Sequence, residues 1–221
     1  MSEQCLVIGH RGTDLGNSKD AFSKAINMGV DAIEMDVRVT KDGVPVIAHD
    51  EDIKNFPVKS TSLRQLRTVE PNLLTLAEAL EHCSGTPLII EIKPHVDVRP
   101  IFTVLKSLPE SKLQQYKIAS FDPRVLKKFL KEMPELPRFV LEKWSGVHAG
   151  YKCRRAKTTN VIMAKRGLWG FYIRAVTKRG YTLYTYTLDN PKKANRWIRA
   201  GLSGIITDHP ERFIRHPGDN A

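Results

Sequence analysis

The sequence has few cysteines and no long hydrophobic run, and both absences exclude common classes of protein. Its three cysteines, Cys5, Cys83 and Cys153, are odd in number and far apart among 221 residues. This spacing argues against a disulfide framework and against a zinc site built on cysteine. Apolar runs such as Leu88-Ile89-Ile90 are far too short to cross a bilayer, and the N-terminus lacks a secretory signal. We therefore expect a soluble cytoplasmic protein.

Acidic residues are scarce in the second half of the chain. Residues 111–221 contain 23 Lys and Arg against 8 Asp and Glu, a net charge of +15, whereas residues 1–110 contain 12 against 16, a net charge of −4. A positive field of this kind attracts phosphates, anionic lipid or nucleic acid. A basic surface that only keeps the protein soluble is the alternative. We expect no specific nucleic-acid partner, and an anionic membrane surface stays open as a partner.

The length and pattern of the chain favour one α/β domain over residues 1–221. Strand Cys5–Gly9, a helix capped by Asn17 or Ser18 and ended by Gly29, and strand Ala32–Val37 form a βαβ unit. Residues 51–69 are irregular and predict a short insertion after the second strand region. Further strands are expected at Leu88–Ile92, Tyr116–Ser120, Arg138–Leu141, Val161–Ala164, Thr182–Thr187 and Ser203–Ile206, and further helices at Leu76–His82, Pro123–Glu132, Gly170–Lys178 and Pro191–Ala200. This alternation permits a TIM (β/α)8 barrel.

Carboxylates recur with a spacing of two within the predicted strands. Glu34 and Asp36 share one face of strand Ala32–Val37, and Glu91 shares a face of the later strand with Lys93. Like charges on one partly buried face call for a cation, and carboxylate oxygens suit Mg²⁺ or Ca²⁺. A solvated strand face is the alternative for Glu34 and Asp36, and simple neutralisation of Glu91 is the alternative for Lys93.

Histidine and arginine follow the first strand, where barrel enzymes place their chemistry. His10 and Arg11 precede Gly12, which allows a sharp turn, and the Arg11 guanidinium matches a phosphate. A second histidine, His49, comes after the hairpin turn at Asp42-Gly43. A pair of histidines can act as general acid and general base near neutral pH, although a lone histidine is more often structural.

These motifs together resemble the successive signatures of the glycerophosphodiester phosphodiesterase family. The resemblance runs from His10-Arg11-Gly12 through Ile33–Val37, His49-Asp50 and Ile90–Lys93 to Gly201–Pro210. It implies a TIM barrel that hydrolyses glycerophosphodiesters to sn-glycerol 3-phosphate and an alcohol. It further implies one divalent cation held by Glu34, Asp36 and Glu91, catalysis by His10 and His49, and phosphate binding by Arg11 and Lys93. We expect His49 to act as the acid and His10 as the base.

Two departures from the family pattern affect the expected substrate more than the chemistry. Leu15-Gly16 stands where the family usually has Pro-Glu, and Asp189 replaces an asparagine. Both changes are expected on the alcohol side of the pocket. Two alternative functions stay open: a lysophospholipase D that acts at a membrane, and a non-catalytic barrel that binds polyanions or membranes. The sequence also leaves open whether the cation is Mg²⁺ or Ca²⁺ and what the oligomeric state is.

Residues 142–159 form a long connection that is expected either to overhang the site or to be a surface excursion with an undetected helix. Its aromatic and basic residues, with Trp169, Phe171 and Tyr172, would suit docking on an anionic membrane. For Phe171 and Tyr172, burial in the core is the stronger expectation, because helix-spaced aromatic residues are usually buried.

Overall fold

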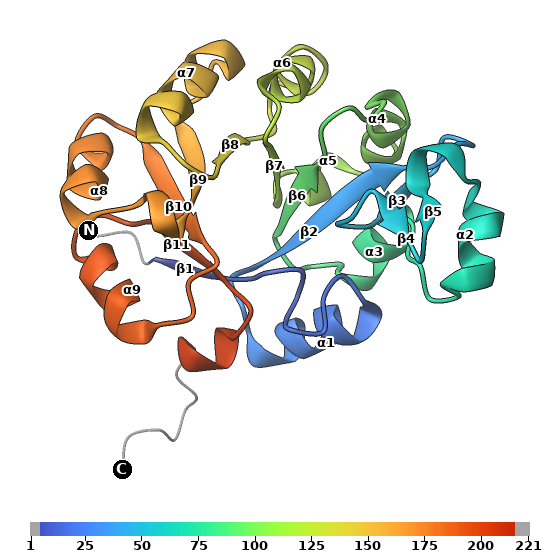
Figure 1. The fold of residues 1–221 in the computed structure, drawn as a ribbon, viewed down its shortest axis with the longest axis horizontal. Coiled ribbons are helices and arrows are strands. Elements are labelled where there is room, and N and C mark those ends of the chain that lie inside the picture. The colour runs from blue at the N-terminus through green and yellow to red at the C-terminus, as the bar shows by residue number, and fades with distance from the viewer. Residues whose placement is uncertain (1–4, 215–221) are drawn as a thin grey trace.

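The computed structural model describes residues 5–214, and its eight parallel strands close into a barrel. Strand β1 pairs with both β2 and β11, which joins the two ends of the sheet (Figure 1). The predicted TIM barrel is thereby confirmed. The barrel strands are β1 (Leu6–Gly9), β2 (Ala32–Val39), β6 (Leu88–Ile92), β7 (Tyr116–Ser120), β8 (Arg138–Glu142), β9 (Asn160–Ala164), β10 (Thr182–Tyr186) and β11 (Gly204–Thr207).

Helices surround the barrel (Figure 1), and they include the five that the sequence predicted together with others that it did not. Ser18 caps the first helix by accepting a hydrogen bond from the Ala21 amide, and Gly29 ends that helix with a left-handed φ of 77°. The principal helices are α1 (Lys19–Met28), α3 (Leu76–His82), α4 (Arg99–Lys106), α5 (Glu110–Leu113), α6 (Pro123–Glu132), α7 (Gly146–Ala156), α8 (Gly170–Thr177) and α9 (Pro191–Ile198), and a short 3-10 helix, η3 (Pro210–Arg212), follows β11. Among the described residues, no helix combines the length and apolarity needed to span a membrane.

The predicted insertion lies between β2 and α3, at the right of Figure 1. It contains β3 (Pro45–Ile47), β4 (Asp52–Ile53), β5 (Phe56–Pro57), the 3-10 helix η1 (Val58–Ser60) and α2 (Leu63–Val69). Strand β3 runs antiparallel to β2, as expected for a hairpin with a turn at Asp42-Gly43. The hairpin brings the residues after β3 back to the end of β2, since the Ala48 amide donates to the Asp36 carbonyl at 3.0 Å.

The barrel strands alternate between two apolar cores. In β2, Ile33, Met35 and Val37 pack against the helices, whereas Ala32 belongs to the cluster inside the barrel. Since side chains alternate along a strand, Glu34 and Asp36 point inward with Ala32. The floor of the barrel is therefore apolar, and the carboxylates lie above it, toward the carboxyl ends of the strands.

Helix α7 occupies most of the connection at residues 142–159, so this segment is ordered as a surface helix rather than as a long loop. Its buried residues Ala149, Cys153 and Ala156 are spaced four and three apart, as on one helix face. The hydrophobic pattern of this helix is weak in the sequence, because its buried side chains are small and it contains two glycines, Gly146 and Gly150.

The expected burial of Phe171 is wrong, because its side chain is 72% exposed. Phe171 lies in the first turn of α8, two residues from the buried Ile173, and residues two apart lie on nearly opposite faces of a helix. Tyr172 does pack against the core, as expected.

Candidate active site

Three buried carboxylates meet at the ends of two neighbouring strands. Glu34 and Asp36 come from β2 and Glu91 comes from β6, where Asp36 and Glu91 are direct partners in the register. One oxygen from each residue lies within 4.8 Å of the others, and all three side chains are buried. Burial, together with the charge of Asp36, raises the pKa of Glu34 to about 8. An ionised Glu34 is therefore disfavoured unless a positive charge lies close to it.

Two cations and an amide contact this carboxylate cluster. The Lys93 Nζ lies 2.5 Å from Asp36 Oδ1 and 2.6 Å from Glu91 Oε1, and the Arg11 Nε lies 3.0 Å from Asp36 Oδ2. The Arg11 backbone amide also donates to Glu34 Oε2 at 3.1 Å. Burial would raise the pKa of Asp36, but the Lys93 ammonium and the Arg11 guanidinium outweigh it and hold that pKa below its usual range.

The donor set fits a hard divalent cation. Carboxylate oxygens are the ligands that Mg²⁺ and Ca²⁺ prefer, and a bound cation would stabilise the ionised form of Glu34, which burial and the charge of Asp36 disfavour. The described residues contain no other cluster of three or more His, Cys, Asp or Glu side chains placed to hold a metal ion together. Glu34, Asp36 and Glu91 are thus the residues that could form a metal site.

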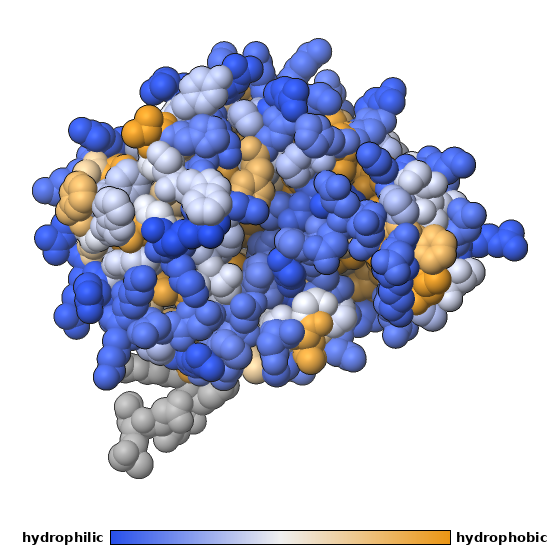
Figure 2. All heavy atoms as spheres, viewed as in Figure 1, coloured by the Kyte–Doolittle hydropathy of each residue, from blue (hydrophilic) through white to orange (hydrophobic). Residues whose placement is uncertain are grey.

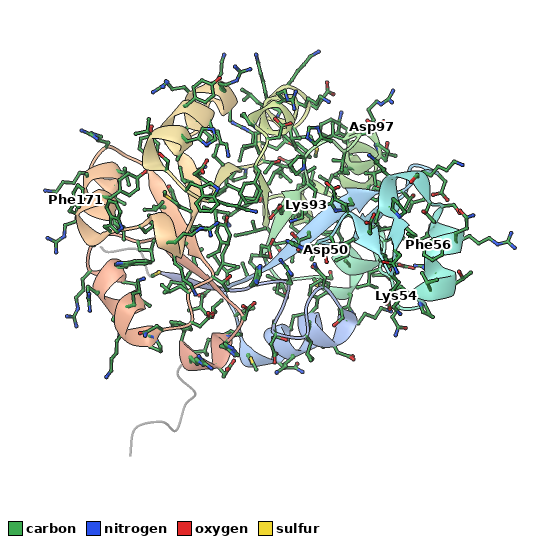
Figure 3. The ribbon with its side chains drawn as sticks, viewed as in Figure 1. Asp50, Lys54, Phe56, Lys93, Asp97 and Phe171 are labelled. Atoms are coloured by element: carbon green, nitrogen blue, oxygen red, sulfur yellow. The ribbon has the colours of Figure 1, made fainter. Side chains whose placement is uncertain are left out.

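Each of the two predicted histidines is held by an acidic neighbour. His10 Nδ1 lies 2.6 Å from Asp208 Oδ1, and His49 Nδ1 lies 2.7 Å from Asp50 Oδ1. In Figure 3, Asp50 and Lys93 both lie near the middle of the molecule, far from the labelled residues at its edges. A carboxylate at Nδ1 fixes the orientation of the imidazole and leaves Nε2 for another partner.

The environments of the two histidines shift their pKa values in opposite directions. Burial lowers the pKa of His10, but the hydrogen bond to Asp208 and the charge of Glu34 outweigh it, so the pKa is raised. Burial and the Lys93 ammonium lower the pKa of His49. His10 therefore holds its proton more firmly than His49 does.

One cavity of about 570 Å³ opens over these groups, and Figure 2 shows a hydrophilic hollow near the middle of this face. Six of the seven residues singled out in the sequence line it: His10, Arg11, Glu34, His49, Glu91 and Lys93. The seventh, Asp36, is not among the lining residues and reaches the site through its contacts with Lys93 and Arg11.

A second wall of the cavity comes from β8 and α7, which sequence reasoning did not assign to the site. The Oε1 atom of the buried Glu142 accepts hydrogen bonds from the backbone amides of Lys143 and Trp144. Its Oε2 atom lies 2.9 Å from Lys152 Nζ and 2.8 Å from His148 Nδ1. All five residues line the cavity. The position of Glu142 at the end of a barrel strand is the signal that could have identified this wall.

Asp208 and Asn17 were also missed, although both lie within segments that carried the resemblance. Asp208 orients His10 across the closure of the barrel. The Asn17 side chain donates to Asp36 Oδ2 at 2.9 Å and accepts from the Asp36 amide at 3.4 Å. Both residues hold other side chains of the site in position, and the spacing of residues along the sequence does not indicate such a role.

The expected place of Asp189 on the alcohol side of the pocket is wrong. Asp189 Oδ1 accepts from Thr207 Oγ1 at 2.9 Å and from the Asp208 amide at 3.3 Å, and Asp189 does not line the cavity. It supports the loop that carries Asp208. Gly16, with a left-handed φ of 58°, also lies outside the cavity lining.

A TIM barrel with buried carboxylates, two oriented histidines and two cations at the carboxyl ends of its strands defines an enzyme site suited to phosphoryl chemistry. Residues 9–212 match the model of the glycerophosphoryl diester phosphodiesterase family, and the chain belongs to that family. It is therefore an enzyme of the phosphodiesterase class.

Individual relatives agree with the family match over nearly their whole length. The chain is 28% identical to a glycerophosphodiester phosphodiesterase of Caldanaerobacter subterraneus, covering 95% of this chain and 96% of the relative. It is 20% identical to a human lysophospholipase D, covering 93% of this chain and 84% of the relative. Among solved structures, it resembles an Oleispira antarctica phosphodiesterase in complex with the product sn-glycerol-3-phosphate, with a TM-score of 0.84, 21% identity and 94% coverage of both chains. A Thermotoga maritima glycerophosphodiester phosphodiesterase gives a TM-score of 0.77 at 25% identity, covering 97% and 99%.

Proposed function

We propose that this enzyme hydrolyses glycerophosphodiesters to sn-glycerol 3-phosphate and an alcohol in a reaction that depends on one divalent cation. The observation that carries the proposal is the convergence of a three-carboxylate cluster, two oriented histidines and two cations in one cavity. The family match supplies the substrate class. A barrel that only binds polyanions would have no chemical need for this combination of groups.

Glu34, Asp36 and Glu91 would hold the cation, which is Mg²⁺ or Ca²⁺ by ligand type. When bound, the ion would stabilise the negative charge that develops on the phosphoryl oxygens. Arg11 and Lys93 line the cavity beside the carboxylates and add two further positive groups for the phosphate. Arg11 offers a planar fork of donors, and Lys93 acts as a point charge.

His10 and His49 would serve as the acid and base pair. A neutral His49 can accept the proton of the attacking hydroxyl, whether that group belongs to water or to the substrate. A protonated His10 can give its proton to the departing alkoxide, and Asp208 stabilises the charged imidazole before the transfer. This proposed order follows the two pKa directions and differs from the order expected from the sequence, with His49 as the acid and His10 as the base.

The test is release of glycerol 3-phosphate from glycerophosphocholine and glycerophosphoethanolamine by metal-stripped protein, with Mg²⁺ or Ca²⁺ added back. His10→Ala and His49→Ala should each lose at least roughly 100-fold in rate, the usual contribution of a general acid or base. Lys54→Ala is the matched control, because Lys54 is an exposed residue of the insertion (Figure 3). Turnover without any divalent ion would contradict the metal dependence, and full activity in either histidine variant would contradict its role.

A lysophospholipase D activity is the second candidate, because the human relative bears that name and exposed aromatic residues lie beside the cavity. Comparing lysophosphatidylcholine with glycerophosphocholine under the same conditions distinguishes the two substrate classes. A preference for the lipid would move the assignment to lysophospholipids with the same catalytic residues.

A further inference from the structure

A continuous stretch of the chain beside the cavity contains no acidic residue. Residues 143–188 include ten Lys and Arg and no Asp or Glu, and they form α7, β9, α8 and β10 with their connections. Lys152 pairs with Glu142 and Lys165 lies 3.6 Å from Asp189, but no described carboxylate lies within ion-pair distance of the other eight. This part of the surface therefore carries a large uncompensated positive charge.

The same stretch contains five of the eight large hydrophobic side chains that are exposed in the described part of the chain. We call these five residues the α7–α8 rim: Trp144, Val147, Tyr151, Trp169 and Phe171. Val147 is 86% exposed and Phe171 is 72% exposed, so neither contributes substantially to the core. The Trp169 and Phe171 rings stack with their centroids 6.4 Å apart, at the left edge of the molecule where Figure 3 labels Phe171.

Contacts between the loops after β8 and β9 connect the part of this surface around Trp144 to the beginning of α8. The Arg166 guanidinium lies 3.6 Å from the centre of the Trp144 ring, and its Nε donates to the Lys143 carbonyl at 3.4 Å. The Tyr172 ring lies where a Cβ on Gly146 would stand, so the first turns of α7 and α8 are in direct contact. Trp144 and Lys143 also line the cavity. The α7–α8 rim is therefore continuous with the mouth of the active site.

We propose that the α7–α8 rim docks the enzyme on an anionic lipid bilayer, with the cavity mouth facing the headgroups. Exposed tryptophan, tyrosine and phenylalanine favour the interfacial region of a bilayer, and each nearby Lys or Arg adds attraction to an anionic surface. A second copy of this chain is disfavoured as the occupant, because two such surfaces would bring uncompensated positive charges together. Nucleic acid would meet the same cations, but the aliphatic Val147 offers it neither a hydrogen bond nor a stacking face.

The experiment is co-sedimentation of the full chain with vesicles of phosphatidylcholine alone or mixed with phosphatidylserine. The wild type should bind the mixed vesicles and lose binding as the salt concentration rises, because the Debye length shortens. The double variant Trp169→Ala/Phe171→Ala should bind them at least roughly 10-fold more weakly, since it removes two large apolar side chains from the contact. Phe56→Ala is the matched control, because Phe56 is also exposed and lies on the opposite side of the molecule (Figure 3).

Turnover of soluble glycerophosphocholine by the same variants separates this proposal from the proposed function. Trp169 and Phe171 do not line the cavity, so the double variant should retain its soluble activity while it loses vesicle binding. Equal vesicle binding by wild type and double variant, or equal binding to the two vesicle compositions, would overturn the proposal. A single-stranded RNA oligonucleotide serves as the competing probe, and RNA binding that is tighter than vesicle binding and lost in the double variant would assign the α7–α8 rim to nucleic acid instead.

Discussion

Replacement of Asn17 by glycine should weaken the binding of the divalent cation without removing any of its proposed ligands. Asn17 Nδ2 donates to Asp36 Oδ2 at 2.9 Å, and its Oδ1 accepts from the Asp36 amide. The residue does not line the cavity, so the substitution leaves the proposed substrate contacts in place. Glycine is the suitable replacement because Asn17 has a left-handed φ of 45°, which alanine would adopt only with strain.

The expected loss of metal affinity follows from the hydrogen bond that the Asn17 side-chain amide donates to the buried Asp36 carboxylate. The Asp36 side chain is only 1% exposed, so water has little access to replace a lost donor. A hydrogen bond to a charged group contributes about 1.5–3 kcal/mol, and loss of a partner that orients a metal ligand typically weakens metal binding about 10–100-fold. We therefore expect the dissociation constant for Mg²⁺ or Ca²⁺ to rise within that range in Asn17→Gly.

Calorimetric titration of metal-stripped protein measures this change, and thermal unfolding shows that the fold is retained. Asn55→Gly is a matched control, because Asn55 also has a left-handed φ, 71°, but lies in the turn between β4 and β5. It should bind the ion as the wild type does. An affinity in Asn17→Gly within twofold of the wild-type value would refute the positioning role of the amide.

Two other carboxylates give predictions that depend on pH. Asp208→Asn removes the negative charge beside His10 that helps to raise its pKa, so the alkaline fall in kcat/KM should move to lower pH while the acid limb, assigned to His49, stays in place; an unchanged alkaline limb would contradict the role of His10 as the acid. Glu142→Gln leaves the buried Lys152 without its carboxylate and should lower the free energy of unfolding at neutral pH by about 2–4 kcal/mol, measured by urea titration. Burial would raise the pKa of Glu142, but backbone amides and Lys152 hold it below its usual range, so this stabilisation is present above the ordinary glutamate pKa and should disappear as the pH falls through the lowered value.

The sequence predicted the carboxylate cluster correctly because its geometry is local. A strand places Glu34 and Asp36 on one face by alternation alone, and β6 is the next strand of the barrel beside β2. Asp36 and Glu91 then face each other without any unusual backbone feature. The strands and helices with a clear hydrophobic period, such as α6, were located for the same reason.

The remaining parts of the site depend on contacts that are distant in the sequence or weakly patterned. Asp208 lies 198 residues from His10, and only closure of the barrel between β1 and β11 brings them together. The wall formed by Glu142 and Lys152 depends on α7, whose buried face consists of small residues. The predicted start of the helix at Gly170 agrees with α8, so the exposure of Phe171 depends instead on which face of α8 packs against the barrel, and Ile173 lies on that face.

A charge balance links the metal to the substrate. Three ionised carboxylates beside Arg11 and Lys93 would leave the cluster one negative charge in excess. Burial and the charge of Asp36 raise the pKa of Glu34 to about 8, so without a bound cation Glu34 would keep a proton at neutral pH. Binding of a divalent cation would then release that proton and make the cluster net positive by one charge. A phosphodiester carries one negative charge and would complete the neutralisation. Substrate affinity should therefore increase when the cation binds, and by linkage the substrate should increase the affinity for the cation by the same factor.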